Sequence, residues 1–220
     1  MTASIKSALD AAVRKTQERK LNPKDHFRMS SMGQCPRAQV GRRAALPPTN
    51  PWATHTSFKM WGGTVIGREI QKLLEEEGYL DPEWTEKEVS YRSYVGHLDG
   101  LTHRLPVGDT VVEIKTSDDS AVKKPDWPEH YLWQGLTYCL ATGCKQLQVF
   151  QFGKNQGLSR DNVFYLTREW EDRLNRHIDE MEKFWGVFEQ TGTLPPHQHF
   201  FGWQDKTCDY LETTKEAVLV

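Results

Sequence analysis

Apolar residues recur every three or four positions in three segments, and this spacing predicts α-helices. The segments are residues 62–79, 128–141 and 168–190. Gly78 and Gly143 stand where the first two would end, which is typical of helix C-termini. The third segment carries a long apolar stripe, so we expect an extended amphipathic helix in the C-terminal part of the chain.

Alternating or β-branched residues predict strands elsewhere. The predicted strands cover residues 87–95, 96–103, 109–117, 147–153 and 162–167. The core order is therefore helix, three strands, helix, strand, with a further strand and the long helix behind it. This order predicts an α/β fold with a mixed sheet flanked by helices, antiparallel strands first and a crossover helix afterwards.

A chain of 220 residues can bury one substantial core, so we expect a single domain over residues 1–220. Its expected parts are an N-terminal arm (1–58), a core (60–155) and a C-terminal strand, helix and tail (156–220). Residues 1–20 have the pattern of a charged amphipathic helix. The remainder of the arm has the composition of loop and short turns, and it includes a proline-rich connection.

Charge and hydropathy narrow the function classes. Charged residues make up 26% of the chain and the net charge is −2, which argues against nucleic-acid binding through overall charge alone. A local positive groove is still compatible with this composition. No apolar run reaches the length of a membrane span, so we expect a cytoplasmic protein without a membrane segment.

The four cysteines form no Cys-x-x-Cys pair. They are Cys35, Cys139, Cys144 and Cys208. In a cytoplasmic chain we expect them to be free thiols. A zinc site built from His197, His199 and Cys208 is an alternative, but the spacing is unlike structural zinc patterns. The sequence therefore favours surface histidines that follow a Pro-Pro turn.

Candidate chemistry lies on the third predicted strand and just before it. Glu113 and Lys115 are two residues apart and project from the same strand face, while their apolar neighbours point into a core. A hairpin centred near Pro106 would place Asp99 opposite Glu113, about 5 Å away between Cβ atoms. A turn slightly further along is the alternative, and it would leave the two acids as diagonal neighbours.

Two adjacent carboxylates repel each other unless a cation lies between them. Oxygen ligands favour Mg²⁺ or Mn²⁺, which would activate a water and neutralise the charge that develops on a phosphodiester. Lys115 would orient or deprotonate that water, or stabilise the developing charge. The alternative is an ordinary glutamate and lysine on a polar strand face.

Three motifs occur in order along the chain: "GHLDG", "VVEIKT" and "HYLWQGLTY". Together they resemble the PD-(D/E)XK nuclease superfamily, in its RecB-like branch, over residues 60–155. The resemblance implies a restriction-endonuclease-like αβββαβ core. It also implies that Asp99, Glu113 and the carbonyl of Ile114 bind the metal. Lys115 would then be the catalytic lysine.

The resemblance extends to the helices on either side. Gln134 and Tyr138 fill the Q-x-x-x-Y positions, which implies a role at a phosphate or a DNA end; a core tyrosine is the alternative for Tyr138. The family also places an acid or histidine on the helix before the strands, and Glu69 is the best candidate for this metal ligand. In the family this ligand usually follows a glycine, and if that glycine is Gly63, the ligand position four residues later is Gly67, which has no side chain to bind a metal. A solvated Glu69 is therefore the alternative.

The stretch "SSMGQCPR" resembles the N-terminal arm of CRISPR-associated RecB-like exonucleases and their phage relatives. In many of these, a cysteine like Cys35 joins three C-terminal cysteines around an iron–sulfur cluster. Cys208 is the single cysteine beyond residue 144, so we expect no such cluster. Arg37, Arg42 and Arg43 are candidates for contacting a nucleic-acid backbone, with a solvated basic surface as the alternative.

We therefore expect a Mg²⁺- or Mn²⁺-dependent deoxyribonuclease. The resemblance favours an exonuclease that hydrolyses phosphodiester bonds from single-stranded or duplex DNA ends in recombination, replication or repair. Recombination or replication proteins are the expected partners besides DNA. The alternatives are a DNA-binding or recombination accessory module with little cleavage, and a structure-specific endonuclease.

Overall fold

The computed structural model describes most of the chain. The described residues are 11–12, 23–50, 54–106, 108–201, Gln204, Cys208 and Tyr210. The predicted helix over residues 1–20 lies outside them except at Ala11 and Ala12, which are helical.

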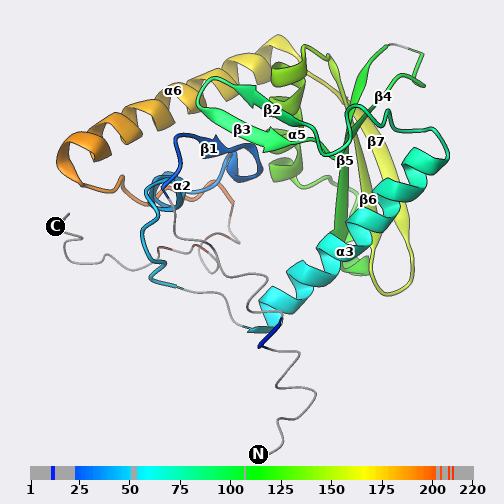
Figure 1. Ribbon diagram of the computed structural model, residues 1–220, viewed down its shortest axis with the longest axis horizontal. Helices are drawn as coiled ribbons and strands as arrows, with labels where there is room; N and C mark the ends of the chain where they lie inside the picture. The colour runs from blue at the N-terminus through cyan, green and yellow to red at the C-terminus, as the bar shows by residue number, and fades with distance from the viewer. Residues whose placement is uncertain are drawn as a thin grey trace, which may run out of the picture.

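The larger of two sheets has the strand order β4-β5-β6-β7 (Figure 1). Its strands are β4 (Gly100–Thr102), β5 (Thr110–Ser117), β6 (Gln146–Gly153) and β7 (Ser159–Tyr165). β5 and β6 are parallel, whereas β4 pairs with β5 and β6 with β7 in antiparallel fashion. The predicted mixed sheet is therefore confirmed.

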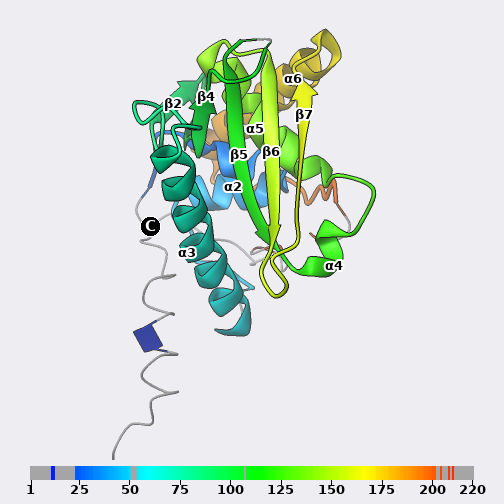
Figure 2. The ribbon, with the colours of Figure 1, turned by 90° about the vertical axis from the view of Figure 1, so that its right-hand side faces the viewer.

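Helices cover both faces of this sheet (Figure 2). α3 (Thr54–Glu76) lies across one face, and α5 (Glu129–Thr142) lies on the other. α5 connects β5 to β6 and is the crossover that two parallel strands require. α6 (Arg168–Thr191) contacts both α5 and α2 (Pro36–Arg43). This is the predicted α/β class with its long C-terminal helix.

The smaller sheet has the order β1-β3-β2. Its strands are β1 (Phe27–Arg28), β2 (Glu88–Tyr91) and β3 (Tyr94–His97). The predicted single strand 87–95 is instead a hairpin, because Arg92 turns the chain with φ 53° and pairs with two acids of α6. The predicted strand 96–103 is divided between the sheets: β3 ends at His97 and β4 begins at Gly100.

The pairing of β4 with β5 has the predicted register. Gly100 pairs with Val112, so Asp99 and Glu113 are the next residues in line on the two strands. The predicted hairpin centred near Pro106 is confirmed. This register sets the two acids side by side at the end of the β4 ladder.

The N-terminal arm has more regular structure than its composition predicted. It contains β1, a 3₁₀ turn at Met29–Ser31 and α2, which begins with Pro36 in its first turn. Its buried apolar residues in the main core are Phe27, Met29, Met32 and Val40. These elements are too short to show a hydrophobic period, so the loop prediction for this part of the arm is wrong.

Two helix predictions also need correction. α3 begins at Thr54 rather than at residue 62, and a short helix, α4 (Asp119–Val122), follows β5. The end of α5 is as predicted, with Gly143 in the left-handed conformation at φ 77°. In the part of the chain that the structure describes, no helix is long and apolar enough to cross a membrane.

Candidate active site

β5 presents different chemistry to the two helices that cover it. Val112 and Ile114 pack with Leu80 and with apolar residues of α3. Glu113 and Lys115 project toward α5, where they meet polar side chains. The alternation predicted from the sequence therefore places an apolar face under α3 and a charged face under α5.

Lys115 joins three of the predicted site residues. Its Nζ lies 2.5 Å from Glu113 Oε1 and donates to Gln134 Oε1 at 2.8 Å. Gln134 Nε2 in turn donates to the Tyr138 hydroxyl at 3.5 Å. Glu113 is 1% exposed, so this ion pair lies inside the protein. The structure thus brings the lysine, one acid and the two α5 residues into one network.

Asp99 completes the network at the start of β4. Its Oδ2 accepts the backbone N–H of Ile114 at 2.7 Å, so the carboxylate is fixed against β5. Burial, and then the charge of Glu113, raise the pKa of Asp99 to about 8. Two carboxylates in one buried site therefore favour a shared proton or a bound cation.

Lys115 is positively charged in this site. Burial lowers the pKa of an ammonium group, but the carboxylates of Glu113 and Asp99 outweigh burial and raise the pKa of Lys115 above its usual value. The ammonium group also lies 5.5 Å from the ring centroid of Tyr131. These surroundings favour a lysine that donates hydrogen bonds and offsets negative charge over one that acts as a neutral base.

Two glycines of "GHLDG" allow the site to close. A Cβ atom on Gly96 would lie 2.8 Å from the Tyr138 hydroxyl, and one on Gly100 would lie 2.8 Å from Leu80 Cδ2. At either distance a Cβ atom would be too close to its neighbour, and one of the two groups would have to move. The glycines therefore let α5 and Leu80 approach the turn that carries Asp99.

The carboxylates fit a divalent cation. Glu113 Oε2 is buried and has no hydrogen-bond partner among the described residues. An unpaired buried carboxylate oxygen costs free energy, and a cation would satisfy it. Asp99 supplies a second carboxylate beside it. A role for the carbonyl of Ile114 stays a prediction.

α3 places the side chain of Gln71 beside Asp99. Gln71 Nε2 donates to the backbone carbonyl of Asp99 at 2.6 Å, and Gln71 is 5% exposed. Glu69 is exposed, and among the described side chains its carboxylate does not join Asp99 and Glu113 in a group of ligand atoms within 4.8 Å of one another. No motif in the sequence pointed to Gln71, because a glutamine on a helix is usually solvated. Metal binding by Glu69 stays a prediction.

The three arginines of α2 make contacts within the protein. Arg37 donates to a backbone carbonyl of the C-terminal tail at 3.2 Å, and Arg42 donates to Gln34 Oε1 at 2.5 Å. The guanidinium carbon of Arg43 lies 4.0 Å from the ring centroid of Trp185. These contacts anchor α2, and binding of DNA by these residues stays a prediction.

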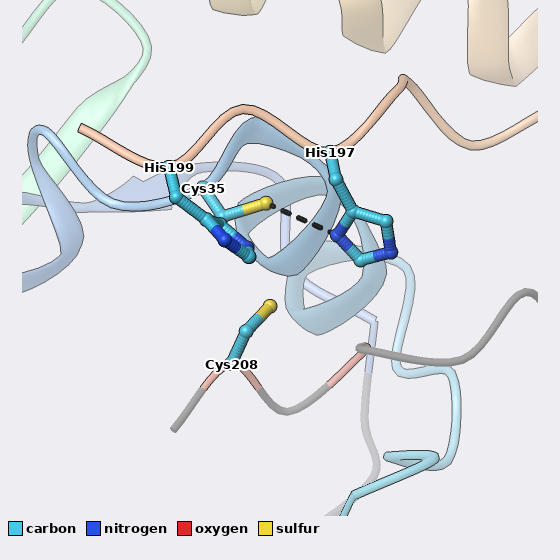
Figure 3. Close-up of side chains that lie close together, drawn as sticks. All are labelled: Cys35, His197, His199 and Cys208. Atoms are coloured by element: carbon cyan, nitrogen blue, oxygen red, sulfur yellow. Dashed lines mark hydrogen bonds between the residues drawn. The ribbon is translucent and has the colours of Figure 1, made fainter. Parts of the chain in front are cut away.

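A second group of candidate ligands lies between the arm and the tail (Figure 3). One ligand atom from each of four side chains lies within 4.8 Å of the others. The residues are Cys35, His197, His199 and Cys208. The expectation of surface histidines is wrong, since both rings are half-buried. Spacing did not reveal the group, because Cys35 comes from the opposite end of the chain. Such a cluster can bind a metal ion.

The raised pKa of Asp99 predicts a pH-dependent stability for the metal-free protein. An acid whose pKa rises from 3.8 to about 8 on folding is protonated only in the folded state between these values. The free energy of unfolding therefore falls as the pH rises through this window, by at most about 1.4 kcal/mol per pH unit. Urea unfolding in chelator at pH 5 and pH 8 should show this fall in the wild type and a smaller one in Asp99→Asn. An equal pH dependence in both proteins would contradict the assignment.

The fold is shared with solved structures, although the sequence matches no protein-family model and no curated protein. SSO0001 matches with a TM-score of 0.56 and 14% identity, over 94% of this chain and 95% of that chain. LHK-Exo, an alkaline exonuclease from Laribacter hongkongensis, matches in its complex with dAMP with a TM-score of 0.51 and 14% identity, over 76% of this chain and 93% of that one. At this identity the likeness establishes an exonuclease-like fold.

Proposed function

We propose that this protein is a divalent-metal-dependent deoxyribonuclease of the PD-(D/E)XK type, in the RecB-like branch. The observation that carries the proposal is the meeting of Asp99, Glu113 and Lys115 in one buried site. The exonuclease-like fold supports it independently of these side chains.

Asp99 and Glu113 would hold the cation, with the carbonyl of Ile114 as a further ligand. This all-oxygen donor set suits Mg²⁺ or Mn²⁺. When bound, such an ion lowers the pKa of a coordinated water and neutralises charge on the phosphodiester. Glu113 Oε2, buried and unpaired, is the protein atom best placed to gain from it.

Lys115 would act beside the acids by donating to the attacking water or to a phosphate oxygen. Gln134 holds the lysine in position through its 2.8 Å hydrogen bond. Burial raises the pKa of Tyr138 well above its usual value, so its hydroxyl keeps its proton and can donate to a phosphate. Together these groups offer donors at a site where negative charge develops.

Attack at DNA ends is the favoured mode. It rests on the resemblance of the motifs to RecB-like exonucleases. The fold shared with LHK-Exo, solved in complex with dAMP, also supports it. Single-stranded or duplex ends would be the substrate.

The position of Glu69 favours a second candidate function. With that residue exposed, no acid of α3 among the described side chains joins Asp99 and Glu113 in a group of ligand atoms within 4.8 Å of one another. A DNA-binding or recombination accessory module with little cleavage would have such an incomplete ligand set.

One panel of substrates separates these functions. The wild type is incubated with linear and circular DNA, single- and double-stranded, in Mg²⁺, Mn²⁺ or chelator. Metal-dependent loss of linear DNA alone supports the exonuclease, whereas cutting of circles indicates an endonuclease. Intact substrates that are nevertheless retarded in a gel would overturn the proposal and favour the binding module.

A further inference from the structure

The structure assigns a structural zinc site to Cys35, His197, His199 and Cys208. Two thiolates and two imidazoles form one of the usual ligand sets of structural Zn²⁺. The site lies between the arm and the tail (Figure 3), and its four ligands include none of the carboxylates of β5.

The geometry is close to that of a single tetrahedral ion. Zn²⁺ binds thiolate sulfur at about 2.3 Å and imidazole nitrogen at about 2.0 Å, which sets its ligands about 3.3–3.8 Å apart. The four ligand atoms here all lie within 4.8 Å of one another, and His197 Nδ1 is 3.7 Å from Cys35 Sγ. A contraction of about 1.5 Å or less per pair would complete the tetrahedron.

The surroundings of the sulfur ligands suit a metal site. Cys35 is 1% exposed and Cys208 is 5% exposed, and both pack in a small core with Ala38 and Tyr210. The two sulfur ligands are therefore shielded from solvent, as in a closed structural Zn²⁺ site.

Nearby hydrogen bonds fix the backbone on which the ligands lie. Asn50 Nδ2 donates to the carbonyl of Cys208 at 3.1 Å, and Arg37 donates to the carbonyl of Pro195 at 3.2 Å. The Tyr210 hydroxyl donates to the carbonyl of Leu46 at 2.8 Å. Arm and tail are thus held together on several sides of the four ligands, as a preformed site requires.

The zinc site has a structural role because both segments it joins rest on α5. In the arm, Gly33 lies against Trp133: a Cβ atom there would be 2.9 Å from the indole. In the tail, Phe200 lies 6.3 Å from the Trp133 ring and Phe201 lies 5.7 Å from the His130 ring. Zn²⁺ would therefore clamp the two segments over the helix that carries Gln134.

The first test is the metal content of the tag-free full-length chain, expressed with added zinc. We expect about one Zn²⁺ per chain, lowered about tenfold or more by Cys35→Ser. Cys144→Ser is the matched control, since this buried cysteine lies outside the cluster, and it should keep its zinc. Iron with labile sulfide, a Cys35–Cys208 disulfide, or equal zinc in both variants would overturn the assignment.

A second measurement uses the wild type alone, and therefore holds even if Cys35→Ser fails to fold. Removal of zinc with a chelator, with no Mg²⁺ or Mn²⁺ present, should lower the Tm by about 5–15 °C, and added Zn²⁺ should restore it. Co²⁺ in place of Zn²⁺ should give the visible absorption of a tetrahedral thiolate site. A Tm unaffected by the chelator, or a colourless Co²⁺ form, would contradict the proposal. Neither readout depends on nuclease activity.

Discussion

Lys115→Ala should lower the rate of metal-dependent DNA hydrolysis by about 100- to 1000-fold, the usual effect of removing one positioned donor from a site of developing negative charge. The charge of Lys115 is maintained by Glu113 and Asp99, which raise its pKa, and Gln134 orients its ammonium group. No other described lysine makes an ion pair with Glu113. Initial rates on linear DNA in Mn²⁺ measure the effect.

Lys145→Ala is the matched control for this variant. Lys145 is exposed just before β6, at the end of the sheet opposite the C-terminal end of β5. Its loss should leave the rate within about twofold, because an exposed charge distant from the site is largely screened. Equal losses in both variants would indicate a general effect of charge on DNA binding and would contradict a catalytic role for Lys115.

Trp133→Ala should have the largest effect on stability, lowering the free energy of unfolding by about 3–5 kcal/mol. The indole is 3% exposed and contacts the rings of Trp170 and His177 at centroid distances of 5.9 Å and 5.3 Å. The Arg173 guanidinium lies 4.7 Å from the indole. Trp133 therefore joins α5 to α6, and its loss leaves a cavity beside Gln134. Urea unfolding measures the change.

Trp61→Ala provides the comparison for Trp133→Ala. Trp61 lies on α3 and is 39% exposed, so its truncation should change the free energy of unfolding by about 0.5 kcal/mol or less. A loss of stability as large as that of Trp133→Ala would show that removal of any tryptophan is sufficient to destabilise the protein to this extent. A stable Trp133→Ala protein would contradict the packing of α5 described above.

The central hairpin could be predicted because the side chains of a strand alternate between its two faces over a short distance. A period of two puts Glu113 and Lys115 on one face, and the hairpin register then puts Asp99 beside them. The structure shows both features. Helices α5 and α6 were predictable for a similar reason, because each is long enough for an apolar stripe to repeat.

Helix geometry explains why Gln71, and not Glu69, is the α3 side chain that contacts Asp99. Successive helix residues are rotated by about 100°, so residues two apart point in nearly opposite directions. Ile70 and Leu74 pack toward β5, and Gln71 follows Ile70 into the interface with Asp99. Glu69 is then turned outward. The sequence showed an apolar stripe but not which edge of it faces the acids.

The four-ligand cluster could be predicted only in part, because the sequence offered His197, His199 and Cys208 as an alternative zinc site without Cys35. Its members come from the arm and the tail, and their approach depends on how α2 and the tail pack against each other. No local period or spacing carries that information. Cys35 is brought to His197 and Cys208 by tertiary contacts alone.

The central claim is that Glu113 belongs to a metal-dependent hydrolytic centre. The most direct measurement is the initial rate of nucleotide release from linear DNA across a Mn²⁺ titration, for the wild type and for Glu113→Gln. Thermal melts must show that the variant is folded at the assay temperature, because the substitution leaves Lys115 without its buried partner. We expect the wild-type rate to rise with Mn²⁺ and the Glu113→Gln rate to stay at the chelator background. A folded Glu113→Gln protein that responds to Mn²⁺ as the wild type does would contradict the claim.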